Sequence, residues 1–114
     1  MVMASKPTHM NERHKDFLSI LAYIYLKNNK LEKAITVYKA LWHLFPESGK
    51  AALCLGYLYL ATQQYETALF YAEAFLAGNQ EIGLGHLLKG QALYKLGKNF
   101  EAKKAIQQFF ASEQ

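Results

Sequence analysis

The strongest constraint on the fold of this chain is a spacing of 34 residues at which similar residue types recur. Four columns share this spacing: Ala34, Ala68 and Ala102; Ala22, Gly56 and Gly90; Leu41, Phe75 and Phe109; and Tyr25, Tyr59 and Leu93. A period of this length is typical of proteins whose repeated units bury their apolar faces only by stacking on one another. The sequence therefore predicts three copies of one small supersecondary unit.

Each copy has the pattern of two helices separated by a short polar break. Apolar residues recur at helical spacing, and the breaks fall at residues 28–30, 62–64 and 97–99. Pro46 ends the second helix of the first copy. The expected helices span residues 16–28, 31–45, 49–61, 65–77, 82–96 and 100–111. An all-α fold follows.

The small columns have a mechanical explanation. A glycine in the middle of a helix, such as Gly56 or Gly90, costs about 1 kcal/mol relative to alanine. That cost is tolerated where a partner helix must approach closely. We expect the alanine column, Ala34, Ala68 and Ala102, to lie on that partner.

These columns resemble the tetratricopeptide repeat (TPR). The matching residues are Leu21, Ala22, Tyr25, Ala34, Tyr38 and Pro46 in the first copy, Leu55, Gly56, Tyr59, Tyr65 and Ala68 in the second, and Gly90, Gly97 and Ala102 in the third. In the third copy Lys89 replaces the leucine that precedes the glycine. The resemblance implies a right-handed TPR solenoid of three helix-turn-helix repeats, about residues 15–48, 49–82 and 83–114. These form a single domain, 15–114, after a flexible N-terminal segment, 1–14.

A solenoid of this class implies a concave groove lined by the first helix of each pair. The implied partner-binding groove residues are Tyr23, Leu26, Lys27, Lys50, Leu53, Tyr57, Leu60, Leu84, Leu87, Tyr94 and Lys95. An apolar groove with a lysine rim suits an amphipathic helix or an extended apolar segment with acidic flanks. For any single tyrosine, ordinary packing between hairpins remains the alternative.

Phe109 and Phe110 form a possible exposed end interface. Phe109 occupies the large column that packs on a following hairpin, and the sequence predicts no following hairpin. We therefore expect a partner or a second copy of the chain to cover this end.

Composition and motifs exclude several classes of function. The net charge is +4 without a basic run, so no nucleic-acid partner is expected. His9, His14, His43 and His86 do not combine with the single cysteine, Cys54, at ligand spacing. We expect no metal, no cofactor and no enzymatic activity. The polar N-terminus has no signal peptide and no apolar run is long enough to cross a bilayer, which predicts a cytoplasmic protein without membrane insertion.

The stretch 38-YKALWHLFPES-48 resembles the small tetratricopeptide chaperones of bacterial type III secretion, the YscG- and YscY-like groups and more distantly LcrH/SycD. The pattern over residues 15–34 is similar to their first repeat. This resemblance implies a bacterial chaperone that holds a small secreted helical protein, a needle subunit or similar export substrate, possibly with a second co-chaperone. Two alternatives stay open: a generic peptide-binding adaptor, and a self-associating scaffold that forms a homodimer without a client.

Overall fold

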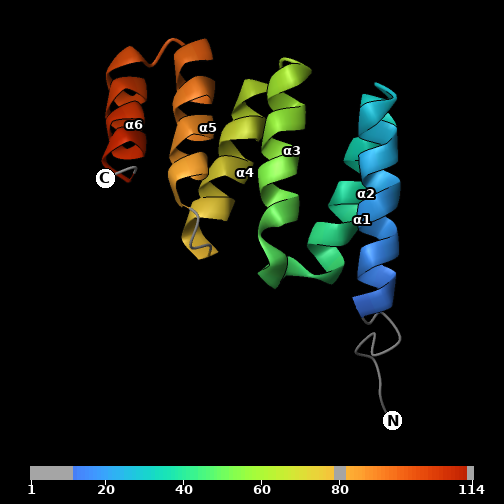
Figure 1. Cartoon of the computed structure of the whole chain (residues 1–114). Helices are drawn as coiled ribbons and strands as arrows, with labels where there is room; N and C mark the ends of the chain where they lie inside the picture. The colour runs from blue at the N-terminus through green and yellow to red at the C-terminus, as the bar shows by residue number, and fades with distance from the viewer. Residues whose placement is uncertain (1–11, 79–81, 113–114) are drawn as a thin grey trace. The chain divides into compact units, whose positions relative to one another are not determined.

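The computed structural model describes residues 12–78 and 82–112 of the chain. These ranges contain helices α1 (Glu12–Lys27), α2 (Leu31–Leu44), η1 (Pro46–Ser48, a 3-10 helix), α3 (Lys50–Ala61), α4 (Tyr65–Gly78), α5 (Ile82–Lys95) and α6 (Asn99–Ser112) (Figure 1). No strand occurs in either range. The predicted all-α helical-repeat fold is confirmed.

The first helix begins earlier than the sequence predicted. It starts at Glu12 rather than residue 16, so residues 12–14, which we expected in a flexible segment, are helical. The run ERHK contains no helix breaker, and Glu12 lies in the first turn, where a carboxylate is favourable to the helix dipole. The rest of that expected segment, residues 1–11, lies outside the described residues.

The end of α2 agrees with the prediction from Pro46. The residue before it, Phe45, has φ −134° and ψ 64°, which is outside the helical region. Proline disfavours the helical conformation in the residue that precedes it. The helix therefore ends at Leu44, and Pro46 begins η1.

The turns inside the three hairpins share one geometry at the same 34-residue spacing. Asn29, Gln63 and Gly97 all have left-handed backbones, with φ of 59°, 65° and 82°. The residue after each donates its N–H to a carbonyl five positions earlier: Lys30 to Tyr25 at 2.9 Å, Gln64 to Tyr59 at 2.8 Å and Lys98 to Leu93 at 2.9 Å. This is the Schellman ending of a helix, which satisfies carbonyls that the last turn leaves without a helical partner.

Contacts divide the chain into two compact units, residues 1–51 and 52–114, and each is described by itself. The single domain over residues 15–114 stays a prediction. In the first unit α1 and α2 form a hairpin, with Ala22 and Ala34 fully buried. The ammonium of Lys15, near the start of α1, lies 5.9 Å from the ring centre of Phe45, which follows α2. The two helices are therefore antiparallel.

The second unit contains α3 from Ala52 onward, α4, α5 and α6, with α5 in contact with both α4 and α6 (Figure 1). A Cβ added at Gly56 would collide with the Leu88 side chain and lie 3.6 Å from the Ala68 carbonyl oxygen. A Cβ added at Gly90 would lie 2.5 Å from Ile106 Cδ1. The predicted close approach at the glycine column is confirmed, and the structure adds its cause. Each glycine receives an apolar side chain from a neighbouring helix.

The shared turn geometry predicts opposite effects of two substitutions. Gly97→Ala should lower the free energy of unfolding by about 1 kcal/mol, because a left-handed backbone strains a residue with a Cβ. Gln63→Gly should raise it by up to about 1 kcal/mol for the same reason. Urea denaturation followed by circular dichroism at 222 nm measures both.

Gly78→Ala is the matched control, since a Cβ there also meets no atom within 4 Å but the backbone is not left-handed. It should leave stability unchanged or raise it slightly. If Gly97→Ala and Gly78→Ala behave alike, the left-handed turn does not determine the stability of the third hairpin.

Candidate functional site

The predicted groove residues all reach solvent to some degree. Those that are exposed are Tyr23, Leu26 and Lys27 on α1, Lys50 on α3, and Leu84, Tyr94 and Lys95 on α5. Those that are half-buried are Leu53, Tyr57 and Leu60 on α3 and Leu87 on α5. None belongs to the buried core, so the assignment to a binding groove stays a prediction for the whole set.

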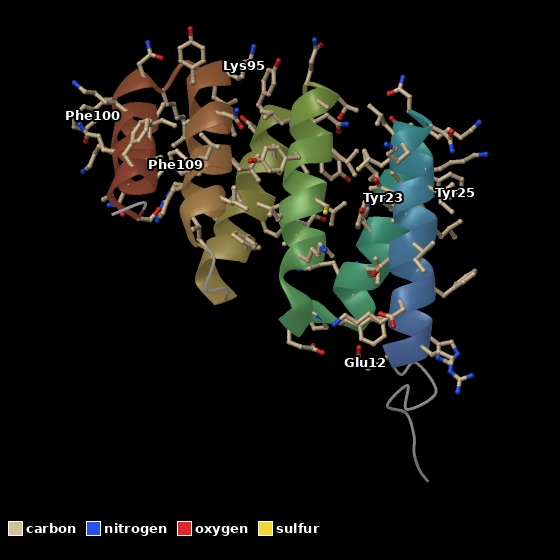
Figure 2. All side chains as sticks on the ribbon, viewed as in Figure 1. Glu12, Tyr23, Tyr25, Lys95, Phe100 and Phe109 are labelled. Carbon is tan, nitrogen blue, oxygen red and sulfur yellow. The ribbon has the colours of Figure 1, made fainter. Side chains whose placement is uncertain are left out.

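In the first unit the candidate residues lie along one side of α1. The Lys27 ammonium is 5.9 Å from the centre of the Tyr23 ring, so the two side chains form a cation–π pair. Tyr23 and Tyr25 project to opposite sides of the helix (Figure 2), as a separation of two residues requires. Tyr25 is only half-buried and has the ammonium of Lys33, from α2, 5.8 Å from its ring centre. Tyr25, the tyrosine of the 34-residue column, therefore contacts α2, whereas Tyr23 is exposed to solvent.

In the second unit two of the predicted groove helices are neighbours. The contact between Gly56 and Leu88 places α3 beside α5. On α3, Leu53, Tyr57 and Leu60 follow the spacing of one helix face. Burial raises the pKa of the Tyr57 phenol. Tyr57 is accordingly half-buried, in contrast to Tyr23 and Tyr94, which are exposed.

Other tyrosines belong to the packing of the hairpins. Tyr38 and Tyr71 are buried, and the Tyr59 and Tyr71 rings stack with centroids 5.6 Å apart and planes 1° from parallel. Phe70 meets Tyr71 edge-on at 5.0 Å. Burial, and then the neighbouring Tyr59, raise the pKa of Tyr71. None of these tyrosines was predicted to line the groove, whereas Tyr94, which was, has 65% of its surface exposed.

The two residues of the predicted end interface on α6 differ in their exposure to solvent. Phe110 is exposed and Phe109 is half-buried, with their ring centroids 5.3 Å apart. The equivalent residue one repeat earlier, Phe75, is 2% exposed and lies against α5 at Gly85. Phe109 thus has the position of a packing residue but keeps part of its ring in solvent. Its role as an interface stays a prediction.

Phe100 is a large exposed residue that the sequence analysis missed. It projects from the start of α6 (Figure 2), and the Lys104 ammonium lies 5.6 Å from its ring centre. The residues 34 and 68 positions earlier are Glu66 and Glu32. An aromatic ring in an otherwise acidic column was a signal available in the sequence.

A hollow of about 360 Å³ on the second unit was not predicted from the sequence. Its lining comes from three helices and one turn: Leu69 and Glu73 of α4, His86, Lys89 and Leu93 of α5, Lys98, and Glu101, Lys104, Ala105 and Gln108 of α6. The Lys89 ammonium and a Glu73 carboxylate oxygen are 3.7 Å apart. Burial, and then the charge of Lys89, lower the pKa of His86. No local motif reveals such a site, because its residues meet only after the helices pack.

The described part of the chain offers little else for chemistry. No group of three metal-ligating side chains occurs among residues 12–78 and 82–112. Within the same ranges, no helix is both long and apolar enough to span a bilayer.

Comparison with known proteins identifies the family. The tetratricopeptide repeat profile matches residues 21–82, which is more than half of the chain. The protein therefore belongs to the tetratricopeptide repeat family. No curated protein matches the chain. Proteins of this all-α fold typically act as non-enzymatic modules for protein–protein interaction, and this is the class of function that the family defines.

The environment of His86 predicts a dependence of stability on pH. Because its pKa is lowered in the folded protein, the unfolded chain binds a proton more readily near pH 6. The stabilisation by neutral His86 is present above its ordinary pKa of about 6.5 and is lost as the pH falls through its folded pKa. His86→Gln should therefore reduce the loss of stability between pH 7.5 and 5, measured by urea denaturation.

Nuclear magnetic resonance titration of the His86 imidazole provides a direct check. Its pKa should rise in Lys89→Gln, because that substitution removes the second cause of the shift. A wild-type His86 that titrates at or above its ordinary pKa would contradict this account.

Proposed function

We propose that the protein is a cytoplasmic chaperone of bacterial type III secretion. It binds a small secreted helical protein, a needle subunit or another early-export substrate, on the apolar side chains of α1, α3 and α5. The observation that supports this most directly is that large aromatic and aliphatic side chains on these helices, such as Tyr23, Leu84 and Tyr94, are exposed to solvent. Shielding a client's amphipathic surface would prevent its premature self-assembly.

The accessible tyrosines favour a protein client. Tyr23 and Tyr94 each present a large ring whose hydroxyl tolerates water, and such rings are common energetic centres of interfaces. Exposed apolar patches on a protein often mark sites of interaction with another chain. A sustained interaction with another chain offsets the exposure.

The charges around these residues favour a client with acidic flanks. Lys27, Lys50 and Lys95 are all exposed, one on each of the three helices. An amphipathic helix would present apolar residues at three- and four-residue spacing to the tyrosines and leucines. Acidic residues beside that stripe would meet the lysines.

A self-associating scaffold is the second candidate. It is favoured by Phe100 and Phe110, which are 74% and 61% exposed on α6. In that case the protein would dimerise without a client. The two functions predict different buried surfaces. A client would cover α1, α3 and α5, whereas self-association would cover α6.

The proposal predicts that Tyr94→Asp abolishes client binding without unfolding the protein. Truncating or charging a central aromatic of an interface typically costs about 2 kcal/mol or more, which is at least a tenfold loss of affinity. The full-length tagged chain is isolated from the bacterium that produces it, and the intact mass of each stoichiometric partner is measured. One small helical secreted protein should accompany the wild type and be absent from Tyr94→Asp.

Phe100→Asp is the matched control, because it introduces the same charge in place of an exposed ring on α6. It should retain the client, and both variants should keep the helical circular dichroism of the wild type. Many substoichiometric partners would favour the adaptor. A dimer of the chain alone that Phe100→Asp disrupts would favour the scaffold.

A further inference from the structure

The hollow on the second unit lies where the third repeat departs from the residues that pack the second repeat. On α5, residues with a titratable group or with less bulk stand in place of apolar residues of α3: His86 for Ala52, Lys89 for Leu55 and Leu93 for Tyr59. Ala52 and Leu55 are buried, whereas His86 and Lys89 are half-buried. The third repeat therefore has an imidazole and an ammonium group at positions where the second repeat has core.

A pair of aromatic rings shows what kind of space the third repeat leaves open. In the second repeat the rings of Tyr59 and Tyr71 stack with centroids 5.6 Å apart and planes 1° from parallel. The equivalent residues in the third repeat are Leu93 and Ala105, and both line the hollow. An alanine in place of a tyrosine removes a whole ring from the contact between the two helices of a hairpin. The resulting volume, about 360 Å³, lies at the lower end of the range for small-ligand sites.

The charged groups around this space favour an anion. The ammonium groups of Lys89, Lys98 and Lys104 outnumber the carboxylates of Glu73 and Glu101. Lys89 and Glu73 are 3.7 Å apart, which is longer than the about 2.7–2.9 Å of a charge-assisted hydrogen bond. Lys98 forms no ion pair with any residue in the described ranges. Both ammonium groups therefore have hydrogens to donate to another acceptor.

The imidazole of His86 lies in the same positive field. Burial lowers the pKa of His86, and the charge of Lys89 lowers it further. The charge of Lys89 therefore acts at the imidazole although the Glu73 carboxylate lies nearby. A negative group entering the hollow would be attracted by this uncompensated charge.

Other classes of ligand fit the hollow less well. A metal cation would be repelled by three ammonium groups. An inorganic anion would meet the lysines but would not cover Leu69, which packs half-buried against the core at Leu93. An uncharged aromatic ligand would cover the Lys89 ammonium without supplying an acceptor, which costs free energy. A carboxylate joined to a ring satisfies both the apolar and the charged part of the lining.

We propose that the hollow binds a carboxylate attached to a compact aromatic body. The ring packs against Leu69 and Leu93 in the space that Ala105 leaves open. The carboxylate accepts hydrogen bonds from Lys89, and Lys98 and Lys104 add positive charge at the rim. Such a group occurs in free arylalkanoates and in protein segments that place phenylalanine or tyrosine beside an acidic residue.

This site is separate from the proposed client surface. The groove residues of α5 are Leu84, Leu87, Tyr94 and Lys95, and none of them lines the hollow. The inference therefore does not depend on the chaperone role, and either can fail without the other.

Titration of the full chain with 3-phenylpropanoate at neutral pH tests the proposal. Amide chemical shifts of residues that line the hollow should change saturably, with a Kd in the millimolar range or tighter, as a ligand of this size allows. Two controls separate the parts of the ligand: 3-phenylpropanamide keeps the ring without the charge, and propanoate keeps the charge without the ring. Each should bind more weakly by about tenfold or more.

Variants locate the ligand in the hollow. Lys89→Gln should weaken binding by about tenfold, because it removes a charge-assisted donor. Lys103→Gln is the matched control, since Lys103 is exposed on α6 beside Lys104 but does not line the hollow. Leu93→Tyr with Ala105→Tyr restores the residues of the second repeat and should abolish binding, because the rings fill the space. Circular dichroism checks that each variant is folded, and Lys89→Gln decides the question where the double variant is not.

A peptide distinguishes the two sources of the ligand. Tighter binding of acetyl-Glu-Phe-Glu-amide than of 3-phenylpropanoate assigns the hollow to a segment of another protein, and the reverse assigns it to a small molecule. No saturable shift with either ligand would overturn the proposal. Equal affinities in Lys89→Gln and Lys103→Gln, or undiminished binding by the folded double variant, would also overturn it.

Discussion

The packing of the second unit depends on apolar side chains that pack directly against glycines of a neighbouring helix. Leu88 lies against Gly56 and Ile106 against Gly90. Each glycine weakens its own helix by about 1 kcal/mol relative to alanine. The close approach offsets this cost, because Leu88 is fully buried and burying such a side chain contributes roughly 1.5–3 kcal/mol. The distance between neighbouring helices in the second unit therefore depends on the absence of a Cβ at Gly56 and Gly90.

This packing leaves the large residues of the first helices with few internal partners. The contact sides of α3 and α5 are occupied by small or fully buried residues, such as Ala52 and Ala92. The tyrosines and leucines on their other sides, Tyr57 and Tyr94 among them, therefore remain accessible to different extents. The binding surface proposed on α3 and α5 would therefore follow from the packing of the core.

Much of this architecture could be predicted from the sequence, because the 34-residue period reports one local structure three times. The helix ends after α1 agree with the prediction to within one residue. The start of α1 does not agree with the prediction, because residues 12–15 contain no helix breaker that would mark a boundary. The hollow lined by His86 and Lys98 was not predictable, because its residues come from separate helices. The exposure of Phe17 was missed for another reason. The 34-residue period shows that Phe17, Ala51 and Gly85 are equivalent positions, but it does not show that only the first of them is exposed.

The columns also distinguish α1 from α5 and α4 from α6. The position that is Gly85 on α5 is Phe17 on α1, whereas Phe75 on α4 corresponds to Phe109 on α6. A chain with a glycine at position 17 would offer a face complementary to its own α6, and head-to-tail stacking of complementary faces generates open filaments. Phe17 removes that complementarity while it keeps the face apolar. The large residue in a small column therefore acts against self-stacking.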